Sequence, residues 1–161
     1  MALAVAVLRS ADQEPAVEEY RVKGAYLLNF AKFVEWPERA FKGPGDPINV
    51  CILGASPFSP SLEAAAHSIV VEKHPVVVKL IPDPPQARQC QIVFVSVAER
   101  RHVRGLLQEV QGGNVLTVGE TEGFLAEGGG AAVVLFGGAV LSSAQHLRRF
   151  VGKGLYLPQA A

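Results

Sequence analysis

The stretch Tyr20–Pro37, YRVKGAYLLNFAKFVEWP, holds the longest helical pattern in the sequence and decides the fold. Two apolar stripes run along it, each with spacings of three or four residues that place its members on one face of a helix. The first stripe is Tyr20, Gly24, Leu27, Ala31 and Val34; the second is Val22, Tyr26, Phe30 and Phe33. One stripe is enough to cover a sheet, so the second needs a further partner. Pro37 stops the helix because proline disfavours helical geometry at the preceding residue.

Polar residues separate the two stripes. Arg21, Asn29 and Lys32 fall between them on one side, and Lys23 marks the boundary on the other side. We interpret the second stripe as a surface for self-association or for a partner protein. Trp36 and Phe124 are further aromatic candidates for that surface, although either side chain can equally serve as a core anchor.

The rest of the chain alternates between apolar strand patterns and helical patterns. The predicted strands are Ile48–Leu53, Pro75–Ile81, Gln91–Ser96, Asn114–Val118 and Ala131–Phe136, with 139–141 as a hairpin partner of the last. The predicted helices after the first are 57–71, 98–110, a short one at 120–126, and 142–151. This order predicts a single three-layer α/β domain, with a mostly parallel sheet of about five to six strands and helices on both faces.

The N-terminal residues 1–14 stand apart from this pattern. ALAVAVL reads as the end of a signal-peptide apolar region followed by a polar stretch, and the alternative is a disordered terminus. We therefore assign the domain to residues 15–161.

Composition narrows the function. Fifteen basic residues balance fifteen acidic ones, so no bulk field attracts nucleic acid. No apolar run approaches the roughly 20 residues that span a bilayer. Neither nucleotide-binding fingerprint is present, and the four histidines lack metal-ligand spacing. We expect no enzyme activity, no cofactor and no metal.

The polar residues best placed for a ligand follow the predicted strands. Ligands of open parallel sheets bind beyond the carboxyl ends of the strands. Ser56, Ser96, Glu120 and Thr121 lie in the turns at that edge. Helix N-termini there can hold an anion, and the competing interpretation is that the hydroxyl groups only cap helices.

The two cysteines leave two alternatives open. Cys51 lies inside a strand pattern and Cys90 immediately precedes another. If these strands are neighbours, the distance allows a disulfide bond; otherwise the residues are two separate buried thiols.

Three blocks of the sequence resemble the YfiR family, a group of small periplasmic proteins of Gram-negative bacteria. They are YRVKGAYLLNFAKFVEWPERAF at 20–41, PINVCILG at 47–54 and NVLTVGETEGFLAEGG at 114–129, and the likeness extends over Val17–Gly129. The resemblance implies a disulfide between Cys51 and Cys90, because at least some members carry a bridge at equivalent positions.

The resemblance also implies a function. Members bind the extracytoplasmic domain of an inner-membrane diguanylate cyclase and hold it inactive, which controls cyclic-di-GMP signalling. A periplasmic location, a homodimer and a cyclase partner follow as expectations. The alternative is a periplasmic sensor module that binds a small molecule and has no cyclase partner.

The C-terminal segment departs from the family pattern. AAVVLFGGAVLSSAQHLRRFVGKGLYLPQAA, residues 131–161, keeps the apolar strand and the glycine turn. It lacks the Ile-Asn motif that usually ends the second strand, and its tail does not match the expected helix. Partner contacts made by this segment are therefore not inferred from the resemblance.

Overall fold

A six-stranded sheet forms the middle layer of the domain in the computed structural model, which describes residues 13–58 and 60–132. The strands are β1 (Ile48–Leu53), β2 (Val70–Val71), β3 (His74–Ile81), β4 (Ile92–Val95), β5 (Leu116–Gly119) and β6 (Ala131–Ala132). Their order is β2-β3-β1-β4-β5-β6, and only the β2–β3 pair is antiparallel. The predicted α/β fold with a mostly parallel sheet is confirmed.

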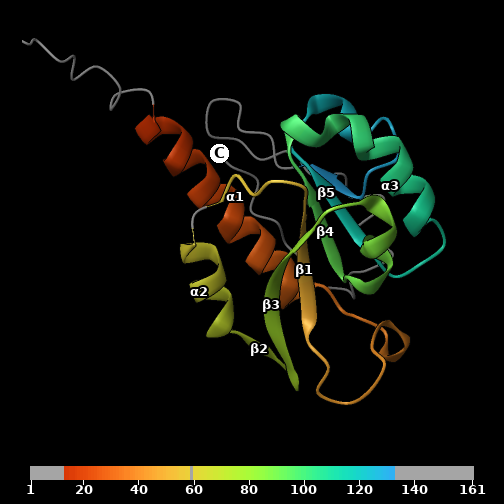
Figure 1. The fold of residues 1–161 in the computed structure, drawn as a ribbon. Helices are drawn as coiled ribbons and strands as arrows, with labels where there is room; N and C mark the ends of the chain where they lie inside the picture. The colour runs from red at the N-terminus through yellow and green to blue at the C-terminus, as the bar shows by residue number, and fades with distance from the viewer. Residues whose placement is uncertain (1–12, 59, 133–161) are drawn as a thin grey trace, which may run out of the picture.

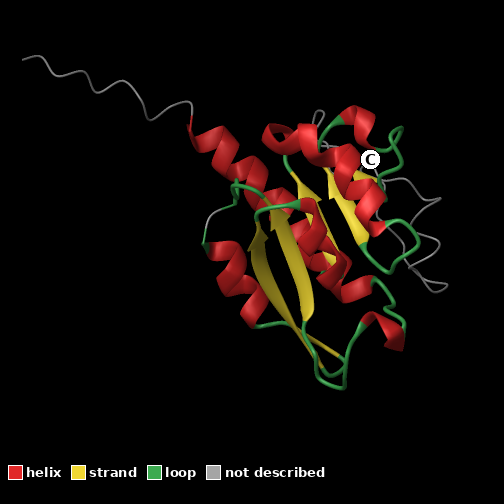
Figure 2. Ribbon diagram, turned by 45° about the vertical axis from the view of Figure 1, so that its right-hand side comes forward, coloured by secondary structure: helices red, strands yellow, loops and turns green. Residues whose placement is uncertain are grey.

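Helices cover both faces of this sheet (Figures 1 and 2). The α-helices are α1 (Gln13–Phe33), α2 (Ser61–His67) and α3 (Val103–Val110). Four short 3-10 helices complete the described chain: η1 (Glu38–Ala40), η2 (Pro84–Gln89), η3 (Val97–His102) and η4 (Glu122–Phe124). Helices α1 and α2 pack on one face, and η2 and α3 pack on the other.

Each face of the sheet has its own hydrophobic core, because successive strand side chains point to opposite sides. In β1, Val50 and Ile52 face α1 and α2, whereas Cys51 and Leu53 face η2 and α3. Every residue of β1 except Asn49 is buried. This explains why the strand reads as a nearly continuous apolar run in the sequence.

Helix α1 buries the first apolar stripe, as its spacing predicts. Leu27, Ala31 and Val34 are at most 3% exposed. The helix begins at Gln13, ahead of the predicted start, and ends at Phe33, ahead of Pro37. The sequence predicts Lys23 as a polar boundary between the two stripes. Its side chain is instead buried on the inner side of α1.

The predicted helix 57–71 is shorter than expected. Helix α2 ends at His67, and Val70 and Val71 instead pair with Pro75 and His74 as β2. β-Branched valines favour this extended pairing, and the turn places Glu72 at a φ of 58°. The predicted helix 98–110 likewise begins as the 3-10 helix η3.

The end of the chain is described only as far as Ala132. The predicted strand Ala131–Phe136 is therefore seen over its first two residues, where it pairs in parallel with β5. The predicted hairpin partner at 139–141 and helix at 142–151 lie outside the described residues.

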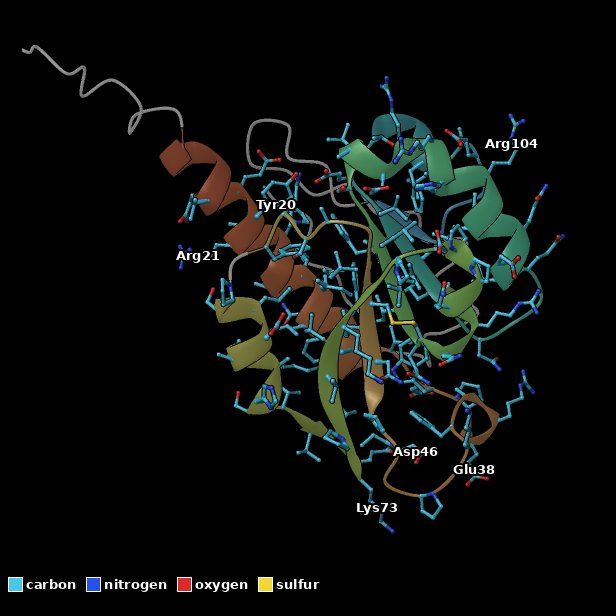
Figure 3. The ribbon with its side chains drawn as sticks, viewed as in Figure 1. Tyr20, Arg21, Glu38, Asp46, Lys73 and Arg104 are labelled. Carbon is cyan, nitrogen blue, oxygen red and sulfur yellow. A yellow bond between two sulfur atoms is a disulfide. The ribbon has the colours of Figure 1, made fainter. Side chains whose placement is uncertain are left out.

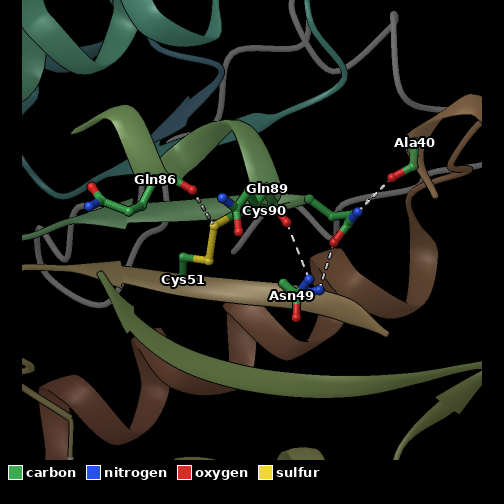
Figure 4. Close-up of a disulfide and its surroundings, with 7 residues drawn as sticks. Ala40, Asn49, Cys51, Gln86, Gln89 and Cys90 are labelled. Carbon is green, nitrogen blue, oxygen red and sulfur yellow. Dashed lines mark hydrogen bonds between the residues drawn. A yellow bond between two sulfur atoms is a disulfide. The ribbon is translucent and has the colours of Figure 1, made fainter. Parts of the chain in front are cut away.

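A disulfide bond joins Cys51 of β1 to Cys90, which follows η2 (Figure 4). The two Cα atoms are 6.1 Å apart, and the bridge closes a loop with a sequence separation of 39. Such a loop contributes on the order of 3–4 kcal/mol by restricting the unfolded chain. The pairing confirms the disulfide that the resemblance implies.

Gln91, the residue after Cys90, fixes the chain segment that links α1 to β1. Its side-chain oxygen accepts a 2.7 Å bond from the Asn49 backbone N–H, and its amide nitrogen donates a 2.7 Å bond to the Ala40 carbonyl. Because Gln91 is buried, these bonds satisfy an amide that would otherwise be costly to enclose.

Candidate functional site

A buried polar network closes the carboxyl edge of the sheet against α1. Helix α1 runs antiparallel to β1, so its Tyr20 end lies at the carboxyl edge and its Phe33 end at the amino edge (Figures 1 and 3). Glu120, immediately after β5, accepts hydrogen bonds from three donors: the Tyr20 hydroxyl at 3.0 Å, the Val97 backbone N–H at 2.6 Å and the Lys23 amine at 2.8 Å. The network thus links α1 to the ends of β4 and β5.

The Lys23–Glu120 ion pair is almost fully enclosed. The Lys23 side chain is 4% exposed and that of Glu120 is 2% exposed. Lys23 also donates to Glu19, one turn earlier on α1, and its amine lies 4.9 Å from the centre of the Tyr20 ring. Two charges in such a place are tolerable only because each has several polar partners.

This enclosure changes how the donors titrate. Burial by itself lowers the pKa of Lys23, but the hydrogen bonds to Glu120 and Glu19 outweigh it and hold that pKa above its ordinary value. Burial, reinforced by the negative charge of Glu120, also raises the pKa of Tyr20. Lys23 is therefore held charged and Tyr20 neutral around the Glu120 carboxylate.

Aromatic packing extends this contact to the loop after β1. Phe58 lies between two rings, with its centroid 5.5 Å from Tyr20 and 5.0 Å from Phe94 of β4, both edge to face. Gly24 allows α1 to approach α2 closely, since a Cβ at this position would be 3.0 Å from Leu62 of α2. The loops that follow β1, β4 and β5 are thus all gathered against α1.

The four residues predicted for a ligand have different environments here. Glu120 is engaged by the chain's own donors, and Ser96 is buried at the start of η3. The Ser56 hydroxyl accepts a 3.1 Å bond from the Phe58 N–H, which stabilises the turn after β1. Thr121 precedes η4 and makes no side-chain cap there, as is also true of Ser96 before η3.

A second polar pair lies at the same edge. His102 is 2.8 Å from Glu99, and the Glu99 carboxyl group packs over Gly54 at the end of β1. Gly54 has a φ of +72°, and a Cβ there would come within 2.4 Å of the carboxyl group, so only glycine fits this arrangement. The pair fastens η3 to the loop after β1.

The residues predicted to form a partner surface include both buried and exposed side chains. Phe30 and Phe124 are 2% and 1% exposed, so both are core residues and their assignment to an exposed surface is wrong. α1 buries a wider arc than one stripe, which encloses Phe30. Val22 and Tyr26 are half-buried, whereas Phe33 is 60% exposed.

A groove of about 1080 Å³ lies at the amino edge of the sheet, at the opposite end of α1 from Glu120. Its walls are the end of α1, the 35–45 segment and the β2–β3 turn. The aromatic lining consists of Phe33, Trp36, Phe41 and His74. Lysine and glutamate side chains also line it, three of each: Lys32, Lys42, Lys73, Glu35, Glu38 and Glu72. Figure 3 shows Glu38 and Lys73 at this end of the molecule.

The wall of the groove is fixed by local contacts. The His74 ring stacks on Phe41, with centroids 3.7 Å apart and planes 7° from parallel. His74 Nδ1 donates to the Asp46 carbonyl oxygen, while the Asp46 carboxylate accepts from the N–H groups of Lys42 and Gly43. The segment before β1 is therefore held in a defined shape.

Sequence reasoning identified Glu120 but missed its partners. Tyr20 and Lys23 are close to Glu120 only after the chain has folded, since the Lys23–Glu120 separation is 97 positions. The one available signal was the position of Lys23 between two apolar stripes, where a charged residue needs a partner if both stripes are covered.

Among the described residues, no three His, Cys, Asp or Glu side chains are grouped as a metal ion would require. In the same part of the chain, no helix has the length and apolar character needed to cross a bilayer. The polar groups at the carboxyl edge bind one another, and the aromatic groove lies at the amino edge. These features place the buried polar network and the groove at opposite edges of an α/β domain.

Comparison with known proteins identifies the family. The family model described as YfiR/HmsC-like matches residues 20–140, three quarters of the chain. The chain therefore belongs to the YfiR/HmsC-like family. Among curated proteins, none gives a significant match.

Proposed function

We propose that this protein is a non-enzymatic periplasmic regulator that binds the extracytoplasmic domain of a membrane-bound diguanylate cyclase and represses cyclic-di-GMP synthesis. Family membership carries the proposal, since the YfiR/HmsC-like family is consistent with regulators of these cyclases. The Cys51–Cys90 disulfide supports an oxidising compartment such as the periplasm.

The outer side of α1 is the surface we assign to the cyclase and to a second copy of the chain. Phe33 is the most exposed aromatic residue there, and Val22 and Tyr26 continue the stripe toward the helix N-terminus. Trp36 extends it to the rim of the groove. Exposed aromatic side chains of this kind often anchor protein interfaces.

Substitution of Phe33 tests this surface directly. Phe33→Asp places a charge at an exposed position, so it should weaken cyclase binding by about 2 kcal/mol or more without unfolding the domain. The measurement is co-purification with the periplasmic domain of a membrane-bound cyclase from the same genome, together with cellular cyclic-di-GMP. Sedimentation of the free protein reports the proposed homodimer.

Leu80→Asp is the matched control, because Leu80 is 58% exposed and belongs to β3 instead of α1. The control should still bind and repress. Retention of full binding and repression by Phe33→Asp would remove α1 from the interface. Failure of the wild-type protein to lower cyclic-di-GMP with any cyclase of its genome would remove the regulatory role.

A second candidate is a sensor that binds a small molecule, and the aromatic groove favours it. Its volume of about 1080 Å³ slightly exceeds the roughly 300–1,000 Å³ of most ligand pockets. A thermal-shift screen with amino acids, nucleotides and sugars tests this function, since a ligand raises the melting temperature by mass action. A hit that Phe41→Ala abolishes would support the sensor.

A further inference from the structure

The two halves of α1 are held to the sheet by different forces. The C-terminal half is fixed by apolar contacts, because Leu27, Phe30 and Ala31 are at most 2% exposed. The N-terminal half has the exposed Val17 and the exposed pair Glu18–Arg21 on its outer side. Its inner side is attached through the polar bonds of Tyr20 and Lys23 to Glu120, with an edge-to-face contact between the Tyr20 ring and Phe58 as its aromatic contact.

We propose that the first half of α1 is a lid over the carboxyl edge of β4 and β5, and that the Lys23–Glu120 pair is its latch. The covered edge contains Ser96, the Val97 N–H and the Glu120 carboxylate. It is the edge where open parallel sheets bind ligands, so the lid controls access to that region. This inference does not depend on a cyclase partner.

The chemistry of the latch makes it reversible. When an ion pair opens to solvent, water hydrates both charges and offsets part of the lost attraction. An apolar contact has no such compensation when it opens. The first half of α1 therefore separates from the sheet at a lower cost than the second half, while Leu27, Phe30 and Ala31 keep the helix attached.

The latch is also directional. The Val97 N–H and the Tyr20 hydroxyl both require an acceptor at position 120, and Glu120 supplies it. An exchange of the two charges, Lys23→Glu with Glu120→Lys, would place an ammonium group against these donors. The reversed pair should therefore fail to close the lid, although it preserves opposite charges.

Hydrogen exchange of the full chain under native conditions tests the lid. In the wild-type protein, amides of 20–24 should exchange at least about tenfold faster than those of 28–33, because they open in a smaller local event. Equal protection of the two halves would overturn the proposal. This measurement needs no variant and does not depend on how any substitution folds.

Two variants then test the latch. Glu120→Gln removes the charge that Lys23 faces, and should speed exchange at 20–24 on the order of tenfold to a hundredfold with little change at 28–33. Adding Lys23→Met to Glu120→Gln removes the buried amine that has lost its carboxylate, while the glutamine oxygen still accepts from the Val97 N–H and the Tyr20 hydroxyl. The double variant should therefore exchange more slowly at 20–24 than Glu120→Gln alone. Uniform acceleration along the chain in Glu120→Gln, or a double variant that opens as readily as Glu120→Gln, would refute the latch.

Glu18→Gln provides the matched control. It removes a carboxylate from the same helical turns, but the Glu18–Arg21 pair is exposed. Exposed pairs contribute little, so exchange at 20–24 should stay within about twofold of the wild-type rate. If Glu18→Gln speeds exchange at 20–24 as much as Glu120→Gln does, the faster exchange comes from the lost negative charge on α1 and not from the opened latch.

Discussion

Tyr20 and Lys23 make the stability of the protein depend on pH in the alkaline range. The pKa values of both are raised in the folded state, so the folded protein retains protons that the unfolded chain loses above about pH 10. Their contribution is fully present below that pH and is lost as the pH rises through the folded-state pKa values. Urea unfolding between about pH 8 and pH 11 should show the free energy of unfolding falling above about pH 10.

Tyr20→Phe isolates the share of this effect that belongs to the phenol. The variant should lose about 1–2 kcal/mol near neutral pH, because it removes a hydrogen bond to a carboxylate. It should also lose stability less steeply at high pH than the wild-type protein. Tyr26→Phe removes a hydroxyl six residues further along α1 and is the control. Equal flattening in both variants would contradict the role given to Tyr20.

Phe124 determines how the segment between β5 and β6 folds back onto the sheet. Its ring lies over two glycines: a Cβ on Gly119 would be 2.3 Å from a ring carbon, and one on Gly129 would be 2.1 Å away. Gly119→Ala and Gly129→Ala should therefore each destabilise the protein by about 2 kcal/mol or more through overpacking. Thermal or urea unfolding measures this change.

Gly123→Ala is the control for the Phe124 contact, since the nearest atom to a Cβ there is 3.7 Å away. It should change stability by less than about 0.5 kcal/mol. Adding Phe124→Leu to Gly129→Ala should cost less than the sum of the two single changes, because the smaller side chain relieves the clash. Strict additivity would show that the ring and the glycine do not interact.

The sequence predicted the elements whose periodicity is strong. Ile48–Leu53 was predicted with its observed bounds, because a strand buried on both faces leaves an uninterrupted apolar run. The early end of the helix predicted over 57–71 could not be predicted, because Val70 and Val71 can belong to a helix or to a strand. Their pairing with β3 decides for the strand. A local sequence pattern predicts whether a long element is a helix or a strand more reliably than it predicts the residue at which the element ends.

The candidate site depended on contacts that no local pattern records. Glu120 was predicted at the carboxyl edge from topology, but its donors come from a helix about 100 positions earlier in the chain. Phe124 was read as a candidate surface residue because the glycines that receive its ring are recognisable only in three dimensions. The groove likewise joins the end of α1 to the β2–β3 turn.

The domain has two cores that share one sheet, and this arrangement predicts how it unfolds. Trp36, the single tryptophan, packs against the core under α1, whereas Leu106 of α3 is buried in the core on the opposite face. β1 contributes alternate side chains to both cores, so neither can lose its packing alone. We therefore expect the described part of the domain, up to Ala132, to behave as one cooperative unit.

Leu106→Ala tests this cooperativity. It should lower the free energy of unfolding by about 2–5 kcal/mol, because it leaves a cavity under α3. Trp36 fluorescence reports the α1 side and circular dichroism reports the entire domain, so both urea midpoints should shift by the same amount. A Trp36 midpoint that stays at its wild-type value while the circular dichroism midpoint falls would mean that the α1 layer unfolds independently of the α3 layer.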